Sequence, residues 1–177
     1  WGDTFPMSDE DKAVKGVTAA LAMTDALKTL NASITQRGYA PLGVGMGLNY
    51  GEAVVGNIGH PQRMEFTVLG DAVNLAARLE GATKTFQQQI LVGGNIYRLA
   101  KGQILFRFVG RIQVKGKLQA VPVYSPLALR TEASESAFDW LPTYESAITH
   151  YFERDFATAR AEFESANEAL GGKDFLC

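Results

Sequence analysis

The sequence has few of the residues that build disulfide scaffolds and zinc sites. Its 177 residues include one cysteine, Cys177, and two histidines. An intrachain disulfide is therefore excluded, and so is a zinc site built from several thiolates. His60 and His150 have no partner at metal-ligand spacing, so both are interpreted as structural or exposed. A chain without disulfides is typical of a reducing compartment, and we expect a cytoplasmic location for this part of the protein.

Long apolar runs and an excess of charge of one sign are missing as well. No apolar run approaches the roughly 18 residues of a membrane-spanning helix, and no signal peptide is visible. The formal net charge of −2 gives no reason to expect nucleic acid as a partner. The apolar fraction of 46% supports a packed core. The chain opens at Trp1 without an initiator methionine, so we expect a piece of a longer protein, in which a preceding segment could hold a membrane anchor.

The periodicity of apolar residues predicts a mixture of helices and strands. Ser8 and Asp11 resemble a capping box, which opens a long amphipathic helix that ends at Gly38. Strands at 42–49 and 52–59 are predicted to form a hairpin. The remaining predicted elements are strands at 64–69, 90–92, 106–114 and 120–124 and helices at 71–80 and 94–101. Because these elements alternate without regular βαβ repetition, we expect an α+β domain with a mostly antiparallel sheet flanked by helices.

The last part of the chain differs in composition from the rest. Residues 126–136 are mostly small and polar, as in a linker. Two helices are predicted beyond it, at 138–151 and 155–170. Apolar and small side chains in the second helix fall where a tetratricopeptide repeat places them, at Phe156, Ala159, Phe163 and Ala166. One such hairpin cannot bury its own apolar face, so it must pack on the main domain, on further repeats or on a protein partner.

Residues 64–82, MEFTVLGDAVNLAARLEGA, pass from a strand into a helix. Gly70 ends the strand, Asp71 is the predicted N-cap, and Gly81 is the predicted end of the helix. Spacings of three and four residues place Asp71, Asn74 and Arg78 on one face. The upstream stretch GVGMGLNYG does not fit a dinucleotide-binding loop, because the segment after it reads as a strand instead of a helix.

The stretch GEAVVGNIGHPQRMEFTVLGDAVNLAARLEG closely resembles the class III nucleotide cyclases, which make cyclic AMP or cyclic GMP. Further on, IQVKGKLQAVPVY resembles the closing hairpin of that family. The resemblance covers about residues 1–125 and implies a ferredoxin-like α+β fold. Trp1-Gly2 resembles the end of a family motif, so residues 1–125 are interpreted as the C-terminal two-thirds of a bacterial-type cyclase domain. The linker 126–136 and a tetratricopeptide-like hairpin at 137–177 follow.

The resemblance also implies roles for individual residues. In the family, the residues at the places of Asn74 and Arg78 stabilise the transition state, in which negative charge builds on the α-phosphoryl oxygens. Lys115 corresponds to the lysine that binds the polyphosphate, and Lys117 is a weaker candidate. Thr67 lies at a position that selects the base, where threonine goes with adenine. The resemblance therefore implies an adenylyl cyclase that converts ATP to cyclic AMP and pyrophosphate.

Family members use two divalent ions, Mg²⁺ or Mn²⁺, and work as head-to-tail homodimers with each active site at the interface. The two metal-binding aspartates are expected upstream of Trp1, with Asp3 as a minor alternative, so the chain alone is expected to be inactive. Two alternatives stay open at this point. One is a guanylyl cyclase, and the other is a non-catalytic regulatory or interaction module that retains the cyclase fold.

Overall fold

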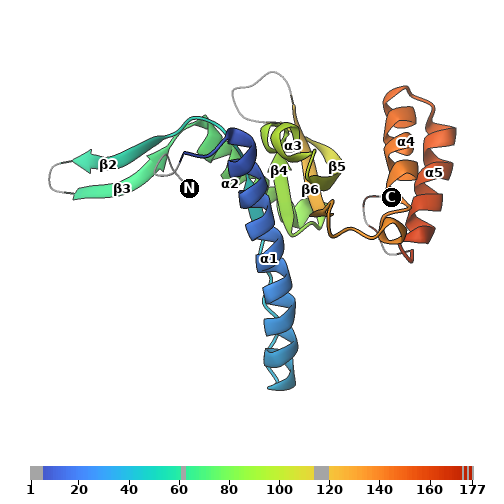
Figure 1. Cartoon of the computed structure of the whole chain (residues 1–177), viewed down its shortest axis with the longest axis horizontal. Coiled ribbons are helices and arrows are strands. Elements are labelled where there is room, and N and C mark those ends of the chain that lie inside the picture. Colours follow the sequence, from blue (N-terminus) through green and yellow to red (C-terminus); the bar gives the residue numbers. More distant parts are fainter. Residues whose placement is uncertain (1–5, 61–62, 114–119, 173, 175, 177) are drawn as a thin grey trace.

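The chain folds into a central sheet with an arm on one side and a helix pair on the other (Figure 1). The computed structural model describes residues 6–60, 63–113, 120–172, 174 and 176. Its helices are α1 (Asp9–Gln36), α2 (Asp71–Phe86), α3 (Gly94–Ala100), α4 (Leu141–Phe152) and α5 (Phe156–Ala169), with a short 3₁₀ turn at Glu135–Ala137. Its strands are β1 (Met46–Leu48), β2 (Val54–His60), β3 (Arg63–Leu69), β4 (Ile90–Gly93), β5 (Ile104–Ile112) and β6 (Val121–Leu129). The predicted α+β class is confirmed.

The central sheet is mixed, with the strand order β1-β4-β6-β5. β1 runs parallel to β4, whereas β6 is antiparallel to both β4 and β5. The predicted hairpin of β5 and β6 is confirmed, and its pairing extends from Ile112 opposite Val121 to Ile104 opposite Leu129. The strand therefore includes residues 126–129. The prediction that these four residues begin a linker is wrong, because they pair with the first residues of β5, from Phe106 opposite Pro126 to Ile104 opposite Leu129.

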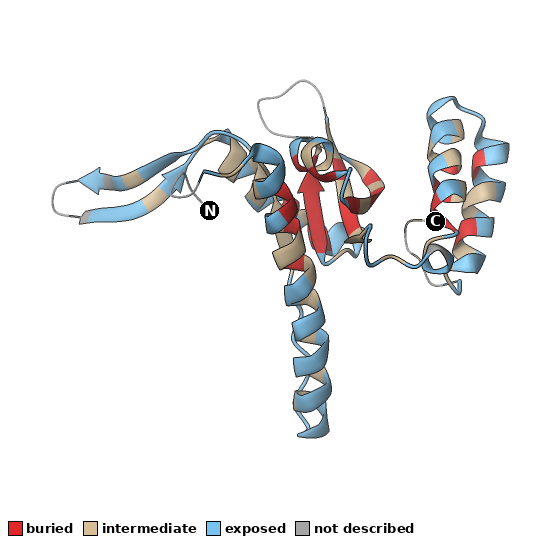
Figure 2. Ribbon diagram, viewed as in Figure 1, coloured by how far each residue is buried: buried red, intermediate tan, exposed pale blue. Residues whose placement is uncertain are grey.

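The predicted hairpin of 42–49 with 52–59 is wrong. β1 is confined to Met46–Leu48 and lies in the central sheet, while β2 pairs in antiparallel register with β3, from Val54 opposite Leu69 to His60 opposite Arg63. Within the described residues, these two strands pair with no other strand. We call β2 and β3 together the arm. Most of its residues are exposed, and it extends away from the body of the molecule (Figure 2).

Helix α1 begins as predicted, because the Ser8 hydroxyl accepts a hydrogen bond of 3.0 Å from the Asp11 backbone N–H. Its first half packs on the sheet with four buried residues, Ala13, Val14, Val17 and Ala20. Its second half projects from the body, and Leu30 there is 46% exposed (Figure 2). The predicted apolar stripe is therefore buried along only half of its length. No helix in the described ranges has the length and apolar character needed to cross a bilayer.

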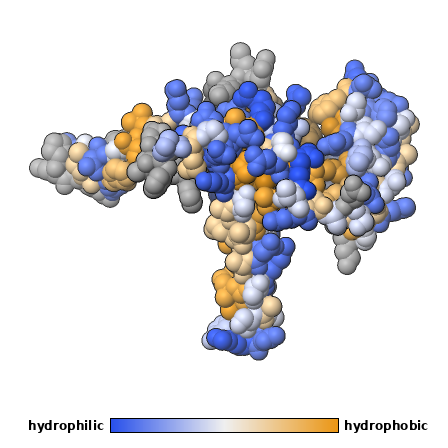
Figure 3. Space-filling view, viewed as in Figure 1, coloured by the Kyte–Doolittle hydropathy of each residue, from blue (hydrophilic) through white to orange (hydrophobic). Residues whose placement is uncertain are grey.

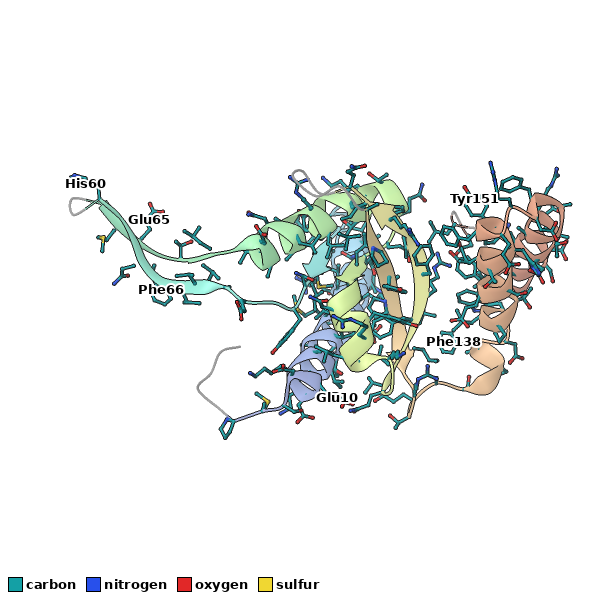
Figure 4. All side chains as sticks on the ribbon, turned by 90° about the horizontal axis from the view of Figure 1, so that it is seen from above. Glu10, His60, Glu65, Phe66, Phe138 and Tyr151 are labelled. Carbon is teal, nitrogen blue, oxygen red and sulfur yellow. The ribbon has the colours of Figure 1, made fainter. Side chains whose placement is uncertain are left out.

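The two C-terminal helices pack on the outer strand of the sheet. Tyr144 of α4 is 1% exposed, and its hydroxyl donates a hydrogen bond of 2.8 Å to the Phe108 carbonyl of β5. Phe152 of α4 meets the Phe108 ring edge to face, and the Arg111 guanidinium lies 5.0 Å from the centre of the Phe152 ring. Side chains from both elements occupy the space between β5 and α4 (Figure 4). Of the three ways to cover the apolar face of the hairpin, the structure shows packing on the main domain.

A buried ion pair joins the end of the chain to the sheet. Arg107 of β5 is 3% exposed and forms two hydrogen bonds with the Asp174 carboxylate, of 2.8 and 3.1 Å. The guanidinium also lies 5.6 Å from the centre of the Trp140 ring and 5.4 Å from that of Tyr144. The planar, bidentate geometry is the one that an arginine fork provides. The charge of Arg107 is thus balanced by a residue that follows α5.

Removing one partner of this pair should destabilise the protein more than removing both. Asp174→Ala leaves a buried guanidinium without its counter-charge, which should cost about 3 kcal/mol of unfolding free energy. In the double variant Arg107→Met/Asp174→Ala, most of that loss should be recovered, since no unpaired charge remains. Denaturant unfolding measures the free energy of unfolding of the single and the double variant.

The matched control is Glu164→Ala, which breaks the exposed pair with Arg160 and should cost less than about 1 kcal/mol. Equal losses for Asp174→Ala and Glu164→Ala would contradict a stabilising role for the buried pair.

A second polar contact joins α4 to α5. His150 Nδ1 lies 2.9 Å from Glu162 Oε2, and the Ser146 hydroxyl donates to the other oxygen of that carboxylate at 2.9 Å. The contact agrees with the interpretation of His150 as a structural residue, and the sequence pattern did not identify its partner, Glu162. The hydrogen bond to Glu162 raises the pKa of His150, and the same hydrogen bond lowers the pKa of Glu162.

The contact should make the stability of the helix pair depend on pH. A histidine with a raised pKa stabilises the fold while it is protonated, and this contribution is lost as the pH rises through the raised value. The thermal midpoint should therefore decrease as the pH rises above the ordinary histidine pKa of about 6.5. Glu162→Gln should flatten this dependence, whereas His60→Asn, which alters the other histidine, should leave it in place. An unchanged pH profile in Glu162→Gln would disprove the coupling.

Candidate active site

The segment that runs from β3 through Gly70 into α2 carries the sequence-predicted site. Gly70, not Asp71, is the N-cap, and the N–H groups of Val73 and Asn74 both reach the Gly70 carbonyl at 3.1 Å. With a φ of 155°, Gly70 adopts a backbone conformation that other residues rarely take. The helix continues past Gly81 to Phe86, since the packing of its second half outweighs the low helix propensity of one glycine.

Helix α2 lies directly on β1, and Gly47 makes this possible. A Cβ atom at Gly47 would collide with the backbone of Ala76 and Glu80, so the two backbones touch where a side chain would otherwise stand. Leu79 lies on the same inward face of α2 and is fully buried. This contact fixes which side of α2 faces the sheet, and the opposite side therefore faces outward.

The outward side carries Asn74 and Arg78. Both are exposed, and neither side chain has a hydrogen-bond or ion-pair partner in the described part of the chain. Residues four apart on a helix place their Cβ atoms about 6 Å from each other. An amide and a guanidinium with unused N–H donors thus stand side by side on a rigid element. Such a pair is suited to bind oxygen atoms of an anionic group such as a phosphate.

The other predicted substrate residues lie apart from this pair or outside the described residues. Thr67 is half-buried in β3, opposite Gly56 of the arm, and precedes the first turn of α2 by only a few residues. Lys115, Lys117 and Asp3 all fall outside the described residues. Three of the four candidates for catalysis and substrate binding are therefore placed, namely Thr67, Asn74 and Arg78. The structure puts them on consecutive elements joined at Gly70.

Sequence reasoning missed a polar cluster at the base of the arm. An open cleft of about 1140 Å³ lies there, and its lining includes Asp9, Tyr50, Asn95 and Arg98. These residues come from α1, α3 and the segment after β1, so their proximity has no local sequence signal. Among the residues that the structure describes, no three histidine, cysteine or acidic side chains gather as they would around a metal ion.

Comparison with known proteins identifies the family. The family described as "Adenylate and Guanylate cyclase catalytic domain" matches residues 4–125, which include the arm, α2 and the whole central sheet up to Ser125. The chain belongs to this family. The predicted resemblance to class III cyclases is confirmed, and the exposed pair on α2 belongs to the matched region.

Curated relatives of this chain include two adenylate cyclases. Adenylate cyclase 1 of Rhizobium meliloti is 31% identical over 137 residues, which cover 75% of this chain and 21% of that protein. The terminal-differentiation specific adenylate cyclase of Dictyostelium discoideum is 31% identical over 171 residues, which cover 94% of this chain and 8% of that protein. The chain thus spans about a fifth or less of these relatives. The second match also extends beyond residues 4–125, since 94% of the chain cannot fit within that range.

Solved structures of both nucleotide specificities share this fold. The adenylyl cyclase CyaB from P. aeruginosa superposes with a TM-score of 0.65 and 34% identity, over 76% of this chain and 68% of that one. The guanylyl cyclase Cya2 superposes with a TM-score of 0.60 and 31% identity, over 76% of this chain and 66% of that one. The fold alone therefore does not distinguish ATP from GTP.

If Asn74 and Arg78 serve chemistry instead of packing, their removal should leave the fold intact. Asn74→Ala and Arg78→Ala should each change the unfolding free energy of the chain by less than about 0.5 kcal/mol, as expected for exposed side chains without partners. Leu79→Ala, on the buried side of the same helix, should cost about 3 kcal/mol. Denaturant unfolding compares the three. A loss of more than about 1.5 kcal/mol for Asn74→Ala would show that this residue has a structural role.

Proposed function

We propose that this chain is part of an adenylyl cyclase that converts ATP to cyclic AMP and pyrophosphate. The observation that carries the proposal is the exposed pair of Asn74 and Arg78 on the outward side of α2, with unused donors among the described residues. The pair stands in a segment that belongs to the cyclase family. A folded module that had lost catalysis would have no need to keep two unpartnered donors side by side, so the non-catalytic alternative has less support.

In the proposed reaction, the ribose 3′ oxygen attacks the α-phosphorus. A bond forms between these two atoms, the bond from the α-phosphorus to the bridging oxygen breaks and pyrophosphate leaves. The proton of the 3′ hydroxyl is released to water. Negative charge grows on the α-phosphoryl oxygens. Arg78 donates two parallel N–H groups to these oxygens and Asn74 donates its amide, and both are held in place by the helix before the reaction begins. Lys115 binds the polyphosphate, as the family resemblance implies.

The residues that the structure describes do not form a site for the two divalent ions used by the family. In our proposal, the ligands of these ions come from outside the described residues. Mg²⁺ or Mn²⁺, when bound, supplies further stabilisation of phosphate charge. The contribution of this chain is the set of donors on α2.

We further propose that the active site is completed by a second copy of the chain in a head-to-tail dimer. The pair on α2 faces outward instead of into a closed pocket, which suits a site shared between two molecules. The arm supports this, because its apolar side chains are uncovered: Val54 is 67% exposed and Phe66 is 74% exposed. Apolar patches on the arm are visible in Figure 3. Exposed apolar surface of this kind marks an interface in many proteins. A protein partner for the helix pair, also predicted, has less support, since β5 already covers one face of it.

The adenine specificity rests on Thr67, which a guanine-specific enzyme would be expected to replace. A guanylyl cyclase is the second candidate, because Cya2 has the same fold. We place the reaction in the cytoplasm, where ATP is abundant and where a chain without disulfides is stable.

The test uses the natural full-length protein with Mg²⁺ or Mn²⁺ and separates catalysis from binding. Asn74→Ala and Arg78→Ala should each lower kcat by about a hundredfold or more while KM for ATP stays within a few-fold, since the donors act mainly on charge that develops in the transition state. Glu80→Ala, an exposed change on the same helix, should leave kcat near normal. Product analysis with ATP and with GTP measures base preference in the same assay.

Two outcomes would count against the proposal. A normal kcat with a raised KM would show that the pair binds only the ground-state nucleotide. Cyclic GMP as the main product would replace the adenylyl assignment with the guanylyl one.

A further inference from the structure

The arm carries Thr67 but has little packing of its own to set its direction. Its apolar side chains are uncovered on both strands, with Val55 58% exposed and Leu69 51% exposed. In the described residues, β2 and β3 pair only with each other. Figure 4 shows His60, Glu65 and Phe66 along the arm, at a distance from the body of the molecule. The angle between the arm and α2 must therefore be fixed where the arm joins the body.

Tyr50 is held at this junction by two helices. Its hydroxyl donates a hydrogen bond of 2.5 Å to the Asp9 carboxylate in the first turn of α1. Its carbonyl accepts a hydrogen bond of 2.9 Å from the Asn95 amide of α3. Arg98 in turn donates to the Asn95 side-chain oxygen at 2.6 Å, which orients the amide. The Tyr50 ring packs against the hydrophobic core between α1 and the central sheet, which includes Val17 and Val92. Side chain and backbone of one residue are thus anchored to different elements.

The residues on either side of Tyr50 carry this constraint to the arm and to α2. Asn49 donates a hydrogen bond of 3.2 Å to the Ala72 carbonyl in the first turn of α2. At Gly51, a Cβ atom would stand 2.9 Å from the Ala72 Cβ, so the chain enters the arm in close contact with α2. At Gly70, where the chain leaves the arm, a Cβ atom would stand 3.0 Å from the Glu52 carbonyl oxygen. The chain therefore contacts α2 at Ala72 where it enters the arm, and it contacts Glu52, two residues after Tyr50, where it leaves the arm.

We infer that Tyr50, clamped by Asp9 and Asn95, is a positioning residue that sets the angle between the arm and α2. Through this angle it places Thr67 relative to Asn74 and Arg78. The clamp itself follows from the contacts above, and its effect on catalysis rests on the proposed function. Such placement matters, because a shift of about 1 Å in a bound substrate can cost up to about a hundredfold in rate. Nothing in the cyclase reaction itself requires a tyrosine at this place.

The clamp can be tested on this chain without any catalytic assay. Two cysteines for spin labels are introduced at exposed sites, Met64→Cys on the arm and Lys84→Cys on α2, in a Cys177→Ser background. Pulsed electron paramagnetic resonance then measures the distance distribution between them. Tyr50→Phe, which removes only the hydroxyl, should shift or broaden this distribution by several ångströms. Tyr39→Phe, an exposed tyrosine outside the clamp, should leave it unchanged.

Variants of Asp9 distinguish loss of the hydrogen bond to Tyr50 from a general loss of folding. Asp9→Asn keeps an acceptor oxygen and should resemble the unmodified chain. Asp9→Ala should resemble Tyr50→Phe, and the double variant Tyr50→Phe/Asp9→Ala should add nothing further, since the two changes remove the same bond. Because Asp9 is exposed, this series keeps the test decisive even if Tyr50→Phe folds poorly. An unchanged distance in both Tyr50→Phe and Asp9→Ala would overturn the clamp.

In the natural full-length protein, Tyr50→Phe should lower the preference for ATP over GTP by about tenfold, with Asp9→Asn close to normal, since the arm carries the base-selecting residue. A merely structural role would lower activity with both nucleotides equally. A changed distance with an unchanged preference would overturn the link between clamp and specificity. If the unmodified protein turns over neither nucleotide, the proposed function fails, while the distance measurement still decides the clamp.

Discussion

The close contact between Gly47 of β1 and the backbone of α2 is the constraint on which the candidate site depends. Because no side chain separates the two elements, α2 cannot roll on the sheet without a collision at Ala76 or Glu80. Leu79 is buried on the side that this contact defines. Asn74 and Arg78 are then directed outward by the geometry of the helix alone. A site built on a regular, backbone-packed helix holds its donors more rigidly than a loop would.

Much of this arrangement follows from local sequence. The passage from strand to helix at Gly70, the hairpin of β5 and β6 and the two C-terminal helices all have signals within a few residues of each element. Asn74 and Arg78 could be recognised as neighbours because a helical period places them together. Their place in the cyclase family also followed from the sequence, since the motif there has many fixed positions.

The errors concern contacts that local sequence does not encode. The turn at Tyr50-Gly51 predicted a hairpin between 42–49 and 52–59, but a turn signal does not say which strand will pair with which. β2 pairs instead with the strand after it, and Tyr50 becomes an anchor for the arm. Arg107 and Asp174 are 67 residues apart, and His150 meets Glu162 only because α4 and α5 fold back on each other. The roles of Thr67, Asn74, Arg78 and Lys115 in catalysis remain predictions.

The ion pair of Arg107 with Asp174 also bears on how the protein unfolds. The pair closes a loop that contains the rest of β5, all of β6 and both C-terminal helices. If the end of the chain separates from an intact sheet, Arg107 loses its counter-charge. Tyr144, which bonds to the Phe108 carbonyl, adds a second tie within the same loop. We therefore expect the helix pair and the central sheet to unfold together. A force or a ligand that displaces the helix pair therefore acts directly on β5.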